Sequence, residues 1–170
     1  KVPLYLEGED VQTDLIGEQT VGVALETDTA RAFYIPGCAH LNDALRERLD
    51  GADIVFFDGT LWQDDEMIKA GLGQKTGQRM GHMSMSGPDG SIEAFATMAI
   101  GQKIFVHINN TNPVLRPDSA ESEQARTAGW IIGLILIDVL RELVVFLWSM
   151  EAYFAGEWAV DVAFIQLGLS

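Results

Sequence analysis

The chain has 170 residues, of which 48% are hydrophobic and 21% charged, and this balance excludes a disordered polypeptide. Its 25 acidic residues outnumber 11 basic residues and give a net charge of −14, which argues against binding to nucleic acid or to an anionic membrane. One cysteine, Cys38, excludes an intrachain disulfide or a zinc site of several cysteines within these residues. A reducing compartment suits that composition, so we expect a cytoplasmic protein.

The first predicted elements are two strands and a helix. Apolar residues alternate over residues 21–25 and resume at residues 32–35, which predicts a hairpin. A short helix is expected to begin near Asn42, to place leucines on one face and to stop at Gly51. The order strand, strand, helix is compatible with an α/β domain.

Further along the chain, apolar strands continue to alternate with helices. The pattern predicts a strand, a helix, a strand and an acidic helix at residues 54–57, 88–98, 103–108 and 119–129. Asp58 follows the first of these strands, and His107 ends the second. We therefore predict an α/β layered domain with its functional site at the strand ends.

The composition changes at Trp130, after which the chain is much more apolar. The stretch "WIIGLILIDVLRELVVFLWSM" has nearly the length of a membrane span, but Asp138, Arg141 and Glu142 lie in its middle. Charges there are costly in hydrocarbon. A buried or interfacial amphipathic helix is therefore favoured over a membrane-spanning one.

Asp58, His82 and His107 are the candidate chemical groups. One carboxylate and two imidazoles are the ligand types that divalent metals use, and they suit either non-haem iron oxygen chemistry or zinc hydrolysis. A structural role is the alternative for two of them. Asp58 can cap an Asx turn in "DGT", and His82 can bond a backbone carbonyl in its loop. For His107 the functional interpretation is favoured, because a strand delivers it into a polar loop.

Other polar residues near these positions leave alternatives open. Asn109, Asn110 and Asn112 are either turn formers or the lining of a pocket that binds a polar small molecule or peptide. Cys38 is either a small buried residue or a group that points at the site. His40, beside a helix start, is favoured as a residue of the cap region over a metal ligand.

Three stretches, in this order, carry a family resemblance: "FYIPGCA", "ADIVFFDGTLWQDDEMIKAGLGQKTGQRMGHMSMSGPDG" and "KIFVHINNTNPVL". They resemble the C-terminal half of the coenzyme PQQ synthesis protein B family, within the metallo-β-lactamase superfamily. The resemblance covers residues 1–130 and implies part of an αββα sandwich. Residues 131–170 lie outside it, and we expect them to form an unrelated apolar, helical extension.

The resemblance also implies a function. The family takes part in making pyrroloquinoline quinone (PQQ), and the complete protein is expected to be a metal-dependent oxygenase that hydroxylates a tyrosine-derived peptide precursor. The alternative is an accessory that carries PQQ or its precursor to the periplasm without catalysis. The expected partners are this precursor, other PQQ-biosynthesis proteins and further copies of the chain, with no nucleic acid and no membrane span.

Roles for single residues follow from the same resemblance. His107 matches the last metal-ligand histidine of the superfamily, His82 a proton-relay histidine, and Asp58 the acid that orients it. Asn109, Asn110 and Asn112 are expected to contact substrate. Cys38 stands where a bridging aspartate is usual, so one divalent metal, iron in preference to zinc, is expected in place of a dizinc site. The family's principal metal motif belongs to the half that these residues do not match, so we expect the chain alone to be inactive.

Overall fold

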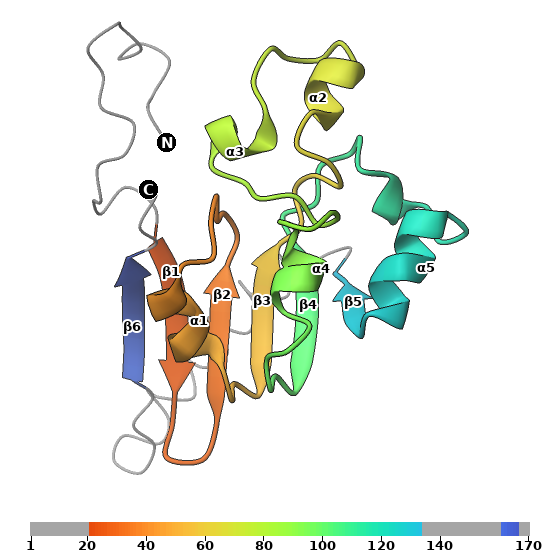
Figure 1. Ribbon diagram of the computed structural model, residues 1–170. Coiled ribbons are helices and arrows are strands. Elements are labelled where there is room, and N and C mark those ends of the chain that lie inside the picture. Colours follow the sequence, from red (N-terminus) through yellow and green to blue (C-terminus); the bar gives the residue numbers. More distant parts are fainter. Residues whose placement is uncertain (1–20, 134–160, 167–170) are drawn as a thin grey trace, which may run out of the picture.

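The computed structural model describes residues 21–133 and 161–166, which build one six-stranded sheet with helices packed against it (Figure 1). The strands are β1 (Val21–Glu26), β2 (Arg31–Ile35), β3 (Ile54–Asp58), β4 (Gln102–Val106), β5 (Trp130–Ile132) and β6 (Asp161–Gln166). The helices are α1 (Asp43–Leu49), α2 (Glu66–Lys69), α3 (Gly77–Met80), α4 (Ser91–Ala94), α5 (Ala120–Thr127) and the 3₁₀ helix η2 (Pro113–Leu115).

The strand order is β5-β4-β3-β2-β1-β6. β1 pairs antiparallel with β2 and with β6, and this confirms the hairpin predicted from alternation. β2, β3, β4 and β5 are parallel to one another. The carboxyl ends of these four strands therefore meet at one edge of the sheet, where Asp58 ends β3 and His107 follows β4. Functional groups of α/β proteins commonly gather at such an edge.

The core lies between the sheet and the helices that cross one of its faces (Figure 1). Phe57 and Phe105 are paired in register on neighbouring strands, and both are fully buried. The Phe105 ring stacks on Trp130 with 3.8 Å between ring centroids and 9° between planes. Leu49 of α1 is also fully buried. Each such side chain contributes about 1.5–3 kcal/mol by leaving water, so this layer fixes the strand ends that carry the site.

Local signals set the two longer helices where the sequence predicts them. The Asn42 side chain caps α1 by accepting a hydrogen bond from the Leu45 backbone N–H at 2.8 Å. Gly51 follows with φ 77°, and Gly129 follows α5 with φ 79°. Glycine adopts this left-handed backbone without the steric cost that other residues incur, so each helix stops where expected.

The middle of the chain differs from expectation in two ways. Residues expected to form an irregular loop contain the four-residue helices α2 and α3. The helix expected over residues 88–98 is α4, which spans only Ser91–Ala94. After α4 the backbone hydrogen bonds join residues three positions apart, and not four as in an α-helix; the Met98 N–H, for example, donates to the Phe95 carbonyl. Tighter turns of the 3₁₀ type thus replace the rest of the helix.

The predicted helical extension needs correction where the structure describes it. Trp130–Ile132 form β5, because the open edge of β4 pairs with them and the Trp130 ring fills the core. Asp161–Gln166 form β6 along the edge of β1, so these residues are a strand and not a helix. The amphipathic helix around Asp138, Arg141 and Glu142 falls in residues 134–160, outside the described residues. Within the described part of the chain, no helix combines the length and hydropathy needed to span a membrane.

Candidate metal and acid–base site

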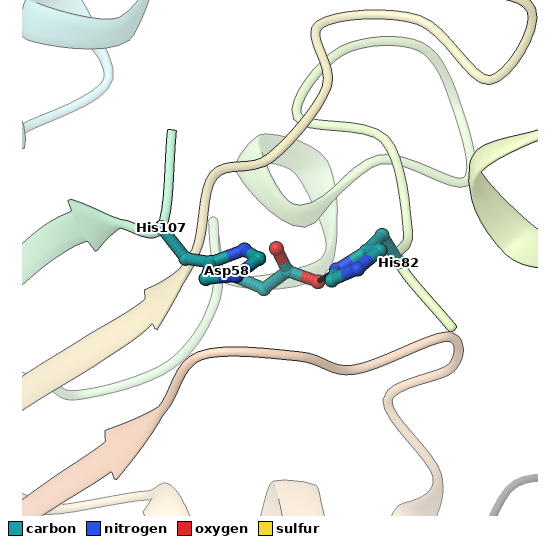
Figure 2. Close-up of side chains that lie close together, drawn as sticks. All are labelled: Asp58, His82 and His107. Atoms are coloured by element: carbon teal, nitrogen blue, oxygen red, sulfur yellow. Dashed lines mark hydrogen bonds and ion pairs between the residues drawn. The ribbon is translucent and has the colours of Figure 1, made fainter. Parts of the chain in front are cut away.

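The structure brings the three candidate groups together. One ligand atom from each of Asp58, His82 and His107 lies within 4.8 Å of the others. Asp58 is the last residue of β3, His107 directly follows β4, and His82 follows α3 after Gly81, whose φ of 92° turns the chain. Figure 2 shows the histidines approaching the Asp58 carboxylate from two different loops. Three segments far apart in sequence thus supply one cluster.

The Asp58 carboxylate is fully buried and accepts four hydrogen bonds. Its Oδ2 accepts from the Cys38 backbone N–H at 3.0 Å and from His82 Nδ1 at 2.9 Å. Its Oδ1 accepts from the Thr60 backbone N–H at 3.1 Å and from the Thr60 hydroxyl at 2.6 Å. Burial of a charge is tolerated only with such partners. The Asx turn of the structural interpretation is therefore present, and the same side chain contacts His82, while the functional role of Asp58 stays a prediction.

Thr60 is the residue of this cluster that the sequence analysis missed. Its hydroxyl oxygen lies 3.0 Å from His82 Nδ1 and 2.7 Å from His107 Nδ1, in addition to its bond to Asp58. The available signal was the "DGT" turn itself, since an Asx turn brings the residue two positions later back to the carboxylate. Thr60 therefore joins all three candidate groups.

The two imidazoles lie nearly parallel, with 5.2 Å between ring centroids and 16° between planes. His82 is buried and bonds side chains in place of the backbone carbonyl that its structural alternative requires. His107 is exposed. Among the described residues, His107 is the non-glycine residue with a positive φ, which is 56°. This conformation is costly for such a residue and is commonly found at functional sites.

Gly59 allows the turn between Asp58 and Thr60 to pass close to β4. A Cβ atom at this position would lie 2.9 Å from Phe105 Cβ, a distance that real Cβ atoms do not adopt. The Gly59 backbone N–H donates to the Val106 carbonyl at 2.8 Å. The absence of a side chain at residue 59 therefore helps to hold Thr60 beside His107.

The three expected substrate contacts occupy different environments. Asn112 is only 2% exposed, its amide nitrogen donates to the Gly59 carbonyl at 3.0 Å, and its Oδ1 accepts from the Val114 N–H. Asn109 donates from its side chain to Thr111 Oγ1 at 2.9 Å. Asn110 is exposed. Asn112 is thus a buried amide that bonds backbone groups, and the substrate contacts expected of Asn109, Asn110 and Asn112 stay predictions.

Cys38 takes the buried role of its two alternatives, within the core cluster. Its Sγ donates to the His40 carbonyl at 3.3 Å. Burial, followed by the charge of Asp58, raises the pKa of the Cys38 thiol to about 12, against a smaller lowering by a hydrogen bond with the His40 backbone. Metals bind the thiolate, so this protonated thiol is a poor ligand. The exposed His40 contributes a backbone carbonyl here, and neither residue belongs to the metal-ligand cluster of the described residues.

Comparison with known proteins gives consistent similarities. The β-lactamase superfamily domain model matches residues 6–108. Coenzyme PQQ synthesis protein B from Xanthomonas oryzae pv. oryzae (strain MAFF 311018) is 55% identical over 135 residues, which cover 78% of this chain and 45% of that protein. The protein of the same name from Ruegeria pomeroyi is 57% identical over 133 residues, covering 78% and 45%.

A solved structure shares the fold. Zn²⁺-bound PqqB from Methylobacterium extorquens is 51% identical and superposes with a TM-score of 0.65, over 67% of this chain and 41% of that one. The chain spans less than half the length of the curated relatives that it matches, at 45% for the protein from Xanthomonas oryzae.

Proposed function

The chain belongs to the β-lactamase superfamily, and on this premise we propose that it forms part of a metal-dependent enzyme of PQQ biosynthesis. The proposal is supported by 55% identity to coenzyme PQQ synthesis protein B and by the cluster at the carboxyl ends of β3 and β4. The activity is proposed for the complete protein, since this chain spans 45% of that relative.

The donor groups of the cluster fit a divalent metal, because imidazole and carboxylate are ligands of iron and zinc. Asp58 already accepts four hydrogen bonds, so we assign direct metal contact to His107, the exposed member of the cluster. One imidazole does not make a metal site, so the proposal requires further ligands from outside the described residues. Iron is favoured over zinc because, when bound, it supplies redox chemistry with O₂ that zinc lacks.

His82 and Asp58 form the proposed acid–base pair. A carboxylate only accepts hydrogen bonds, so His82 donates its Nδ1 proton to Asp58 Oδ2 at 2.9 Å. The neutral ring then carries its lone pair on Nε2, which can take a proton from a substrate hydroxyl and return it. Asp58 holds the ring in this tautomer, as carboxylates do for catalytic histidines elsewhere. This pair, placed beside His107, is the observation that carries the proposal.

The proposed reaction is hydroxylation of the ring of a tyrosine-derived peptide. A ring C–H becomes C–OH with one oxygen atom of O₂, and the other atom leaves as water after taking two protons and two electrons. The electrons must come from an external reductant. We assign the transfer of the phenolic proton to His82, whose ring the buried Asp58 orients through their hydrogen bond.

The proposal can be tested in a complete protein. Residues 21–133 would replace the matching part of the Xanthomonas relative in a PQQ-producing strain that lacks its own copy. We expect PQQ production from this chimera and its loss in His107→Ala. His40→Ala is the matched control, because His40 is exposed and lies outside the cluster. Unchanged PQQ output from His107→Ala would overturn the proposal.

The purified chimera distinguishes catalysis from carriage. It would be loaded with Fe²⁺ or Zn²⁺ and given a tyrosine-containing precursor peptide, O₂ and a reductant. We expect oxygen consumption and a product heavier by one oxygen atom with iron only. Binding of the peptide without oxygen consumption, with either metal, would overturn the enzyme proposal in favour of the carrier alternative.

A further inference from the structure

We propose that Glu66 is a positioning residue that sets, through the Thr111 hydroxyl, which end of the Asn109 side-chain amide faces a substrate. Two contacts carry the inference: Thr111 Oγ1 lies 2.8 Å from Glu66 Oε1 and 2.9 Å from Asn109 Nδ2. The contact of Asn109 with substrate rests on the function proposed above, whereas the orientation of its amide can be tested without metal or substrate.

These three residues join the two loops that carry the candidate site. Glu66 is the first residue of α2, in the segment that follows β3, and Figure 1 shows α2 beyond the carboxyl end of that strand. Asn109 and Thr111 belong to the loop that follows β4. The Asn109 backbone N–H donates to the Thr60 carbonyl at 3.1 Å, so this loop is held beside the turn that begins at Asp58.

The first step assigns the proton of the Thr111 hydroxyl. A carboxylate has no proton to donate, so the hydroxyl donates to Glu66 Oε1. Glu66 Oε2 accepts from the Trp62 backbone N–H at 2.7 Å. Met67 Sδ, 3.8 Å from Thr111 Oγ1, is a weak acceptor and does not compete with the charged oxygen. The Thr111 proton therefore lies on the side of Glu66.

The second step assigns the Asn109 amide. With its single proton directed to Glu66, Thr111 Oγ1 can only accept, so the amide turns its NH₂ group and not its oxygen toward this hydroxyl. The second N–H of the amide meets Met67 Sδ, which lies 3.0 Å from Asn109 Nδ2. The two ends of an amide have nearly the same shape, so the order of donors and acceptors decides its orientation.

The third step follows from what this orientation leaves unused. Both N–H groups of the Asn109 amide have acceptors within the chain, and its Oδ1 has no hydrogen-bond donor among the described residues. Asn109 is half-buried and lies two residues after His107. A substrate at this position therefore meets a hydrogen-bond acceptor. The matching group of the tyrosine-derived peptide is a backbone N–H, since its phenolic hydroxyl is assigned to His82.

Glu66→Gln should reverse the order of donors and acceptors. The Trp62 N–H still requires an oxygen, so the new amide would turn its NH₂ group toward Thr111. The Thr111 hydroxyl would then accept from residue 66 and donate to Asn109, whose amide must turn its oxygen toward the hydroxyl. Thr111→Val removes the hydroxyl but keeps the branched shape, and Thr111→Ser keeps the hydroxyl. Both substitutions at residue 111 leave the contact between Glu66 and Trp62 in place.

The test uses the full chain labelled with ¹⁵N at neutral pH, without metal. Exchange of side-chain NH₂ protons with water is measured for Asn109, for the exposed Asn110 and for the buried Asn112, each assigned through its own backbone. In the wild type the Asn109 protons should exchange more slowly than those of Asn110. Glu66→Gln and Thr111→Val should speed their exchange by roughly two- to tenfold, the equilibrium factor of one hydrogen bond, and Thr111→Ser should not.

Asn112 separates positioning from general loosening of the loop, because its side chain bonds the Gly59 carbonyl and not Thr111. We expect its exchange to stay at the wild-type rate in each variant. Unchanged exchange at Asn109 in a folded Glu66→Gln would overturn the proposal, and so would equal acceleration at Asn109 and Asn112. If the variants do not fold, the wild type alone decides, because exchange at Asn109 as fast as at Asn110 contradicts the assigned orientation.

Kinetics of the purified chimera separate this proposal from the proposed function. Glu66→Gln should raise KM for the precursor peptide by roughly tenfold and leave kcat nearly unchanged, because it removes one binding contact away from the reacting ring. A turned amide with unchanged KM would uphold the action of Glu66 on Asn109 and overturn the contact of Asn109 with substrate. A chimera that consumes no oxygen would overturn the proposed function and leave the exchange result standing.

Discussion

His82 Nδ1 lies 2.9 Å from Asp58 Oδ2, and the carboxylate that accepts this bond is completely buried. Two backbone N–H groups, from Cys38 and Thr60, complete its surroundings together with the Thr60 hydroxyl. The pair therefore links three segments of the chain, and its chemistry and the stability of the fold depend on the same bonds.

Asp58→Asn should destabilise the protein. In the variant, the side-chain NH₂ group of the amide would face N–H and O–H donors that now bond a carboxylate oxygen of Asp58. Each hydrogen bond to a charged group contributes about 1.5–3 kcal/mol. We expect the free energy of unfolding in urea to fall by roughly 2–4 kcal/mol, on the same basis. Asp89→Asn, at an exposed position, is the control and should change it little. Equal stability of the two variants would contradict the described role of Asp58.

Cys38 should make the protein less stable in alkali. The pKa of its thiol rises from 9.0 to about 12 on folding, so between these values the unfolded chain has lost a proton that the folded chain retains. The contribution of the protonated Cys38 thiol to stability is therefore fully present below about pH 9 and is lost as the pH approaches 12. The difference in unfolding free energy between wild type and Cys38→Ala should shrink over this range. Tyr34 and Lys103 occur in both proteins, so their own pKa shifts cancel in the comparison. A constant difference would refute the raised pKa.

The same thiol should resist alkylation in the native state. Iodoacetamide reacts with thiolate, and the buried Cys38 side chain remains protonated at neutral pH. Labelling followed by mass spectrometry should be slow in buffer and fast in denaturing urea. Rapid labelling of the folded chain would show that Sγ is accessible and ionised.

Asn112 and Asn110 provide a matched pair of substitutions in one loop. Asn112→Ala leaves the Gly59 carbonyl and the Val114 N–H without their side-chain partner, and we expect a loss of about 1–3 kcal/mol in unfolding free energy. Asn110→Ala, at an exposed position, should change it by no more than about 0.5 kcal/mol. Chemical denaturation of both variants checks this, and a reversed order would mean that Asn112 is not structural.

Gly59→Ala tests the close approach of β3 and β4. The added Cβ would lie 2.9 Å from Phe105 Cβ, so the strands must move apart, and overpacking of this kind costs about 1–3 kcal/mol. Gly73→Ala is the control, because its Cβ would meet Met67 Cβ at an ordinary 3.8 Å. Thermal unfolding should show a lower midpoint for Gly59→Ala alone. Similar midpoints would indicate that the turn has room for a side chain.

The sequence predicted those parts of the fold that have a short local signature. Alternation revealed the hairpin of β1 and β2, and Asn42 with Gly51 marked the ends of α1. The candidate cluster could be predicted because Asp58 and His107 each stand at the carboxyl end of an apolar strand, and parallel strands have their carboxyl ends at one edge of the sheet. Four-residue helices such as α2 and α3 are too short to show a helical period.

What the sequence did not predict depends on contacts between distant residues. Thr60 looks like an ordinary turn residue until His107, 47 positions later, is placed 2.7 Å from its hydroxyl. Asn112 looks like a loop amide until the Gly59 carbonyl lies against it. The described start of the apolar run, Trp130–Ile132, contains no polar residue whose spacing could distinguish strand from helix, and its pairing with the edge of β4 makes it a strand.

The pairing of β6 with β1 also bears on how the chain folds during its synthesis. Val21 is the partner of Gln166, so the first strand described here gains this neighbour only when the ribosome has nearly finished residues 1–170. Until then the backbone N–H and C=O groups on the outer edge of β1 have no hydrogen bonds to β6. Unpaired strand edges of this kind can pair with other chains. A nascent or prematurely terminated chain that ends before Asp161 would therefore depend on a chaperone, or on an adjoining segment, to shield that edge from aggregation.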